Sequence, residues 1–169
     1  MLDFILEVRA TGTIGKEENM EEVFAPLLDV FSVLTDTTLA QSWGRTPKGS
    51  LIYPQDNKLK VGHIVDVIPH GMKQSLKVKV RLIHHLEFVE MEIIEGPMFG
   101  NLKFAIETRP YGTMLSVVLD YRIESLGFNI KWKLSEKKRY REMIDSVLDN
   151  IKSLSEMRRA SPQPLEAPL

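Results

Sequence analysis

The chain has 169 residues, the length of one domain, and its 43% hydrophobic and 27% charged residues are typical of a globular protein. With 22 Lys and Arg against 23 Asp and Glu, the formal charge is -1, which argues against a dedicated nucleic-acid binder. Cysteine is absent, so thiol nucleophiles, cysteine-ligated metals and disulfides are excluded. Apolar runs are short and interrupted by charge, and we expect a cytoplasmic protein.

The N-terminal third predicts a strand and two short helices. Alternating apolar residues that predict the strand occur at Phe4, Leu6, Val8 and Ala10. The apolar residues of the first helix are Leu27, Leu28, Phe31 and Leu34. A break at Thr35-Asp36 separates this helix from a second one over 37–43.

The middle of the chain predicts an antiparallel meander. The expected strands cover 50–53, 61–68, 76–83, 89–94, 102–107 and 115–123. The last four form two hairpins, in which Lys79 is expected opposite Glu90 and Lys103 opposite Asp120. Alternation then gathers the aliphatic side chains on one face, which needs an apolar layer to cover it.

The C-terminal part predicts a long amphipathic helix that supplies this layer. Its apolar stripe consists of Tyr140, Met143, Ile144, Val147, Leu148, Ile151 and Leu154. The helix is expected to begin between residues 128 and 135 and to end near 157. We therefore predict a single domain over 1–157 and a disordered proline-rich tail over 158–169, with a docking peptide as the alternative for the tail.

These elements describe a two-layer α+β domain, with about six or seven antiparallel strands curved around the long helix and two short helices after the first strand. Three local motifs add a resemblance: the run Ala25-Pro26-Leu27-Leu28-Asp29-Val30-Phe31-Ser32-Val33-Leu34-Thr35-Asp36 followed by Trp43, the segment Glu95-Gly96-Pro97 to Gly100, and the turn at Gly112-Thr113. Over residues 20–157 the chain resembles the helix-grip fold of the START, polyketide-cyclase and pollen-allergen superfamily (SRPBCC).

One departure concerns the N-terminus. In the family the first strand leads directly into Ala-Pro, whereas here residues 12–22 separate the strand predicted at 4–10 from Ala25-Pro26. Four acids lie in between, at Glu17, Glu18, Glu21 and Glu22. Either the family strand is 20–24 and the first 14 residues are an extension, or an acidic loop has been inserted.

The resemblance implies an apolar cavity between the sheet and the long helix. Family members bind lipids, sterols, polyketides, quinones or plant hormones there; some are cyclases or dehydratases, and others carry ligands, assist chaperones or recruit enzymes to membranes. The residues expected to bind the ligand are Trp43, Tyr53, His63, Val78, Val80, Glu87, Met91, Phe104, Val117, Leu119, Tyr121, Tyr140, Met143, Ile144 and Val147. Eight methionines in the chain suit an adaptable apolar lining.

The polar members of this set are the candidates for chemistry. Glu87, His63 or Tyr121 could transfer protons in a cyclase or dehydratase, because a cavity would shift their pKa values. Each could equally sit at the rim or bond a neighbour, and the other phase of the strand would turn Gly62, Ile64, Asp66 and Ile68 inward. We predict no metal and no cofactor, since no ligand spacing or phosphate loop occurs.

One basic concentration stands out, at Lys131, Lys133, Lys137, Lys138, Arg139 and Arg141. It is expected to be a solvated helix face, with contact to anionic lipid headgroups or an acidic partner as the alternative. The acidic N-terminal stretch could pair with it across the fold or within a homodimer. Trp132, beside these lysines, is either a cavity lid or an exposed anchor. The leading hypothesis is a carrier or presenter of a hydrophobic small molecule; the others are an enzyme and a membrane-recruitment or chaperone-assisting domain.

Overall fold

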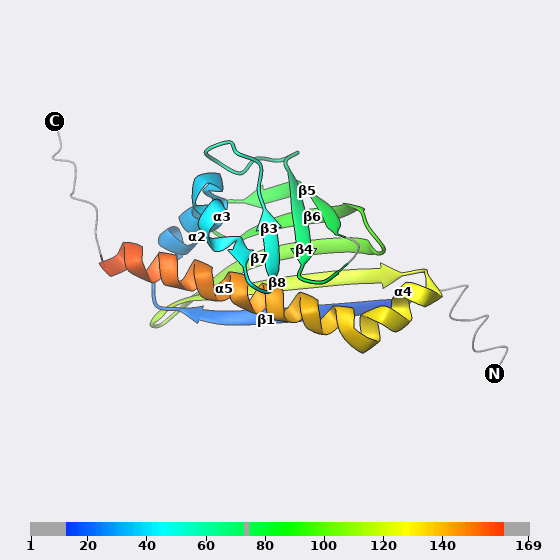
Figure 1. Ribbon diagram of the computed structural model, residues 1–169. Coiled ribbons are helices and arrows are strands. Elements are labelled where there is room, and N and C mark those ends of the chain that lie inside the picture. The colour runs from blue at the N-terminus through cyan, green and yellow to red at the C-terminus, as the bar shows by residue number, and fades with distance from the viewer. Residues whose placement is uncertain (1–12, 73–74, 161–169) are drawn as a thin grey trace, which may run out of the picture.

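The computed structural model describes residues 13–72 and 75–160, in which an antiparallel sheet wraps around a long C-terminal helix (Figure 1). The strands are β1 (Thr13–Val23), β2 (Arg45–Thr46), β3 (Gly49–Ile52), β4 (Ile64–Pro69), β5 (Leu76–His84), β6 (Phe88–Glu95), β7 (Phe99–Arg109) and β8 (Gly112–Ile123). The helices are α2 (Leu27–Thr35), α3 (Thr37–Trp43), α4 (Leu126–Lys131), the π-helical turn η1 (Trp132–Glu136) and α5 (Lys137–Ala160).

The eight described strands form one sheet in the order β1-β8-β7-β6-β5-β4-β3-β2, so β1 crosses over to pair with the last strand. The two short helices α2 and α3 follow β1, and α5 lies across the concave side of the sheet (Figure 1). The predicted α+β helix-grip class is confirmed. The number of described strands is one above the upper expectation, because the two-residue β2 was not expected.

Strand β1 contains the acidic segment and leads directly into Ala25-Pro26. The acids thus lie in the strand that leads into Ala25-Pro26, and the alternative of an inserted acidic loop is wrong. This strand is longer than the expected 20–24, and the residues before Thr13 lie outside the described ones. Successive side chains of a strand point to opposite faces. Glu18 and Glu22 are exposed, whereas Glu17 and Glu21 face cations of α5.

The register of the β5–β6 hairpin differs from the prediction by two residues. Lys79 lies opposite Glu92, not Glu90. The connection is longer than a two-residue turn, because His84 pairs with Phe88, and a further irregularity follows along the strands. Up to Val80 the shift of two residues keeps each side chain on its expected face. Beyond the irregularity between Val80 and Leu82 the faces change, so that Leu82, expected inward, is exposed and Ile83 packs against the core.

The β7–β8 hairpin is also shifted by two residues, for the opposite reason. Arg109 pairs with Gly112, so the loop is only two residues long and not the four-residue turn that the Pro and Gly positions suggested. Asp120 consequently lies opposite Asn101, and the predicted pairing of Asp120 with Lys103 is wrong.

The C-terminal helical segment begins earlier than predicted, at Leu126, where the Ser125 side chain accepts a hydrogen bond from the Phe128 amide. It continues through η1 into α5, which ends at Ala160, three residues beyond the expected end of the domain. Arg159 belongs to this extension, and its Nη1 donates to the Phe24 carbonyl over 2.8 Å. The strand predicted over 4–10 and the tail residues 161–169 lie outside the described residues.

The core lies between the inner sheet face and α5. The helix supplies the predicted stripe, and the strands supply alternate positions such as Val78, Phe104 and Val117, all without exposed surface. On β4 the inward residues are Val65 and Val67, so neither Ile64 nor its even-numbered neighbours form the inner set. None of the described helices is both long and apolar enough to cross a membrane.

Candidate functional site

The residues predicted to form the two walls of a cavity do face each other, but they pack together in one core and leave no space between them. Strand residues such as Val80 and Met91, and helix residues such as Ile144 and Val147, have no accessible surface. A space that holds even one water molecule would leave the atoms around it accessible. The interior that these described residues enclose is therefore filled by side chains, at the close packing usual for protein cores.

Two of the predicted polar site residues lie on surface turns. The His63 Nε2 is 3.1 Å from Asp56 Oδ2, and its Nδ1 accepts from the Lys60 amide. Glu87 is exposed on the β5–β6 turn, where its carboxylate lies 3.0 Å from His84 Nδ1. Parity failed for Glu87 because it belongs to the turn and not to a strand. The two residues lie on different turns and form no proton-transfer pair.

Trp43, at the end of α3, is a packed plug with all its polar atoms satisfied. Its Nε1 donates to the Val33 carbonyl over 3.0 Å, in the last turn of α2, where carbonyls lack partners within the helix. Its own carbonyl accepts from Asn150 Nδ2 of α5. Its ring packs edge-on against Tyr53, with 5.1 Å between centroids.

The opposite end of the grip holds a second aromatic group, which we call the η1 cluster: Tyr121, Trp132 and Tyr140. Trp132 packs 5.2 Å from Tyr121 and 5.9 Å from Tyr140, measured between ring centroids, and is buried. Gly15 of β1 makes room for the Tyr121 ring, because a Cβ at that position would collide with the Tyr121 hydroxyl. Trp132 is thus a lid over the interior and not an exposed anchor.

Within and beside the η1 cluster lie buried polar atoms without hydrogen-bond partners among the described residues. These atoms are Trp132 Nε1, Tyr140 Oη, Asn129 Oδ1 and Glu136 Oε2; at the other end of the grip Tyr53 Oη is in the same state. Each such atom costs about 1–3 kcal/mol relative to a solvated one. Trp132 and Glu136 belong to η1, and Asn129 and Tyr140 lie in the helices on either side of it. Single π-helical turns occur frequently at functional sites.

Both buried phenols keep their protons. Burial raises the pKa of Tyr53 far above its usual value. Burial also raises the pKa of Tyr140, and the negative charge of Glu17 adds to this increase. A neutral phenol can donate one hydrogen bond and accept another, so both hydroxyls can hold a carbonyl or hydroxyl oxygen.

Beside the η1 cluster, a buried carboxylate ties β1 to α5. The Glu17 side chain is 4% exposed and lies 3.1 Å from Lys137 Nζ and 2.6 Å from Arg141 Nη1. The predicted pairing between the acidic segment and the basic run thus occurs across the fold. Sequence reasoning missed Glu17 itself, although its position, two residues after Gly15 on an alternating strand, places it inward.

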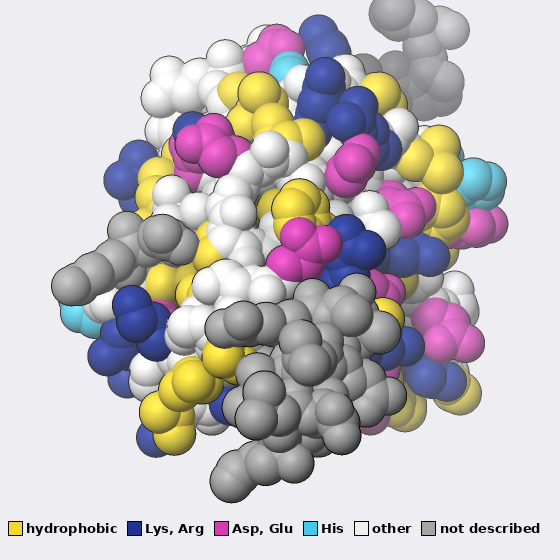
Figure 2. Space-filling model, turned by 90° about the vertical axis from the view of Figure 1, so that its right-hand side faces the viewer, with side chains coloured by type: hydrophobic (Ala, Val, Ile, Leu, Met, Phe, Trp, Pro, Cys, Tyr) yellow, Lys and Arg dark blue, Asp and Glu magenta, His cyan; other side chains and the backbone are white. Residues whose placement is uncertain are grey.

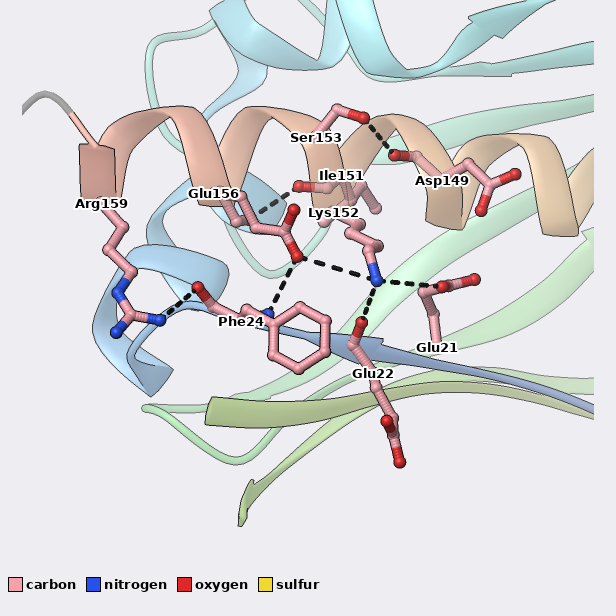
Figure 3. A network of polar contacts seen from close by, with 10 residues as sticks. Glu21, Glu22, Phe24, Asp149, Ile151, Lys152, Ser153, Glu156 and Arg159 are labelled. Carbon is pink, nitrogen blue, oxygen red and sulfur yellow. Dashed lines mark hydrogen bonds and ion pairs between the residues drawn. The ribbon is translucent and has the colours of Figure 1, made fainter. Parts of the chain in front are cut away.

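The same β1–α5 junction continues toward the C-terminal end (Figure 3). Lys152 Nζ lies 3.6 Å from a Glu21 carboxylate oxygen, and Glu156 accepts from the Phe24 amide over 3.0 Å. Burial, and then the hydrogen bond and negative charge of Asp149, raise the pKa of Glu21. These contacts hold the edge strand to the helix through polar groups and leave the apolar stripe of α5 for the rest of the sheet.

Two surface hollows in the described part of the chain concern the site. One, of about 450 Å³, is lined by Lys133, Lys137, Lys138, Arg141, Glu142 and Asp145. The other, of about 260 Å³, is lined by Leu28, Phe31, Ser32, Thr35, Asp36, Asn57, Lys58 and His85. In the described ranges no three His, Asp or Glu side chains gather in a way that could hold a metal ion.

Comparisons with known proteins show the fold. No family model and no curated protein matches the sequence. Among solved structures, norcoclaurine synthase from Thalictrum flavum, in complex with dopamine and hydroxybenzaldehyde, is similar with a TM-score of 0.66 and 16% identity, and the match covers 94% of each chain. Major latex-like protein 151 from Panax ginseng has a TM-score of 0.61 and 18% identity over 84% of this chain and 97% of its own.

A protein of Thermus thermophilus is similar at a TM-score of 0.64 and 14% identity, and the match covers 89% of this chain and all of the other. At such identities the likeness concerns the fold alone. The fold is the helix-grip fold that the motifs around Ala25-Pro26 and Trp43 predicted.

Proposed function

We propose that the protein binds a hydrophobic small molecule between its sheet and α5, and that the η1 cluster anchors the polar end of this ligand. The supporting observation is the pair of unpartnered donors, Trp132 Nε1 and Tyr140 Oη, buried side by side beneath a π-helical turn. Buried polar groups in proteins nearly always have partners. A ligand oxygen would supply the missing one.

Because the interior is filled, binding requires the lid to move. The α4–η1 segment is joined to β1 through a hydrogen bond from Asn129 Nδ2 to Thr13 Oγ1 and to β8 through the ring of Trp132. A π turn contains one extra residue, so its conversion to α-helix would rotate the preceding residues by about 100°. The Trp132 ring would then leave its place against Tyr121 and Tyr140, and the ligand would occupy that volume.

The proposed ligand has a flat or flexible apolar body and a carbonyl or hydroxyl group, as in lipids, polyketides and quinones. The remaining wall would come from the predicted residues of the sheet and of α5. Tyr53 could hold a second polar group at the α3 end. The protein would act as a carrier or presenter in the cytoplasm. The enzymatic alternative has less support, since Glu87 and His63 lie on separate turns.

Native mass spectrometry of the protein purified from cells tests this proposal, together with titration of ubiquinone, oleate and anilinonaphthalene sulfonate. We expect at least one apolar ligand to bind with 1:1 stoichiometry. Tyr140→Phe and Trp132→Phe should weaken its binding about threefold to tenfold, the value of one hydrogen bond. Tyr111→Phe is the matched control, because that hydroxyl is at the surface and donates to Glu22.

Absence of any bound ligand, or equal affinities for Tyr140→Phe and Tyr111→Phe, would contradict the proposal. Circular dichroism melts of each variant verify that a weaker affinity does not result from unfolding.

A further inference from the structure

The outer side of the lid segment carries a row of exposed apolar side chains. Leu126, Ile130 and Leu134 follow one another at intervals of four residues and are 40%, 52% and 80% exposed. They lie on the side of the helix away from the buried Asn129 and Trp132. Exposed apolar residues that occur singly need no explanation, but an aligned row indicates an interaction surface.

Cations flank this row. Lys131 and Lys133 are exposed, and neither takes part in an ion pair within the described part of the chain. Lys133 also lines the hollow of about 450 Å³, whose six lining residues include four cations. Figure 2 faces this end of the molecule and shows apolar and cationic side chains next to each other on the surface.

The nearby acids do not cancel these charges. Glu136 is mostly buried and pairs with Arg139, and Glu142 pairs with Lys138 and Lys48. Glu17 neutralises Lys137 and Arg141 from the inside. The outward side of the segment therefore keeps a local positive charge, although the whole chain carries a formal charge of -1.

We propose that α4 and η1 dock the protein on an anionic lipid bilayer, with Leu126, Ile130 and Leu134 inserted between the headgroups and the lysines beside them contacting phosphates. Apolar residues on one side of a helix with lysines around them are the pattern of interfacial helices. Protein interfaces, by contrast, are depleted in lysine. Negative leaflets attract such lysines, and the attraction decreases with salt.

Co-sedimentation with vesicles tests this proposal on the full chain. We expect binding to phosphatidylcholine vesicles that contain phosphatidylserine, weaker binding at high salt, and little binding to pure phosphatidylcholine. Leu134→Ser should lower partitioning about tenfold, and Lys131→Gln and Lys133→Gln about fivefold each. Matched controls are Leu82→Ser and Lys16→Gln, which are exposed on β5 and β1 and should leave partitioning unchanged.

The proposal is overturned if the lysine and leucine variants partition as the controls do, or if anionic vesicles bind no protein. It is also overturned if Leu134→Ser abolishes a concentration-dependent dimer in sedimentation velocity without changing vesicle binding, since the row would then be an interface between two copies. Salt-sensitive binding lost in both sets of variants supports it. These results do not depend on whether an apolar ligand occupies the interior.

Discussion

Each end of the grip buries one tryptophan, and the two tryptophans differ in whether the indole N–H has a hydrogen-bond partner. At the α3 end, Trp43 Nε1 donates to Val33, and its carbonyl accepts from Asn150. At the η1 end, Trp132 Nε1 has no partner among the described residues, and the helix around it is π-helical. An indole N–H that donates to a buried carbonyl stabilises the fold, whereas a buried N–H without an acceptor is available to a ligand.

The comparison also separates two kinds of packing. The α3 end is closed by two short helices, and the Asp36 side chain between them accepts hydrogen bonds from two amides of the first turn of α3. The η1 end is closed by a helical segment with apolar residues on its outer side and lysines around them. We infer that the α3 end is the rigid base of the domain and the η1 end its movable part.

The largest predicted effect tests the buried charge at the η1 end. Lys137→Met combined with Arg141→Met leaves the Glu17 carboxylate buried without a cation. The free energy of unfolding should fall by about 3 kcal/mol. Glu17→Gln should cost less, because the cations that it frees are about half exposed and remain solvated. Urea denaturation measures both, and a larger loss for Glu17→Gln would contradict this account.

The second prediction compares the two tryptophans directly. Trp43→Phe should lower the free energy of unfolding by about 2 kcal/mol, because it removes ring volume and also leaves the buried Val33 carbonyl without its donor. Trp132→Phe removes similar volume but no hydrogen bond, so its cost should be about 1 kcal/mol. Equal losses in chemical denaturation would show that the missing partner of Trp132 has no energetic meaning.

A smaller effect of the opposite sign is expected for the buried hydroxyls. Tyr140→Phe and Tyr53→Phe each remove an unpartnered polar atom from the interior and should leave stability unchanged or raise it by up to about 1 kcal/mol. Thermal unfolding monitored by circular dichroism tests this. A clear destabilisation by either change would mean that the hydroxyl has a partner in solution, such as an ordered water molecule.

The smallest predicted effect concerns pH at the β1–α5 junction. Because the pKa of Glu21 is raised in the folded state, the folded protein binds this proton more tightly than the unfolded chain does. The contribution of Glu21 to stability is therefore present at low pH and is lost as the pH rises above about 4.5. Relative to wild type, Glu21→Gln should gain about 0.5 kcal/mol or less at neutral pH and show a flatter pH dependence.

Denaturation midpoints measured from about pH 4 to about pH 8 would show this difference, with Glu18→Gln as the control on the outward side of the same strand. A variant of Glu21 with an unchanged slope would assign the pH dependence to other groups.

Several features could be predicted because they depend on alternation. The inward positions of the strands and the stripe on α5 follow from periods of two and of about 3.6 residues, which hold wherever the elements pack. The registers could not be predicted, because a shift of two residues keeps the same alternation of faces. The β7–β8 hairpin moved by two residues, as did the β5–β6 hairpin at Lys79 and Val80. Glu87 was misplaced because alternation ends where a strand ends.

The resemblance and the periodicity also could not decide whether the sheet and helix enclose a space. Whether Met91, Phe104 and Ile144 line a cavity or fill it depends on how closely the helix approaches the sheet, a quantity that no local pattern encodes. Tyr121 and Tyr140 were in the predicted binding set and Trp132 was predicted as a lid or an anchor, but that the three meet in the η1 cluster could not be predicted for a similar reason. Its residues come from β8 and from both sides of a π turn, and Gly15 of β1 is what lets them meet.

By itself, the sequence determined that this chain has an α+β fold without cysteine chemistry, with an acidic start and a basic patch on its last helical segment. Those properties follow from composition and from local periodicity. Only the tertiary structure decided that the acidic start pairs with the basic patch inside the molecule, since Glu17 meets Lys137 and Arg141 across the fold. It also left Lys131 and Lys133 exposed beside an apolar row, because which charges are cancelled depends on which side of a helix faces the sheet.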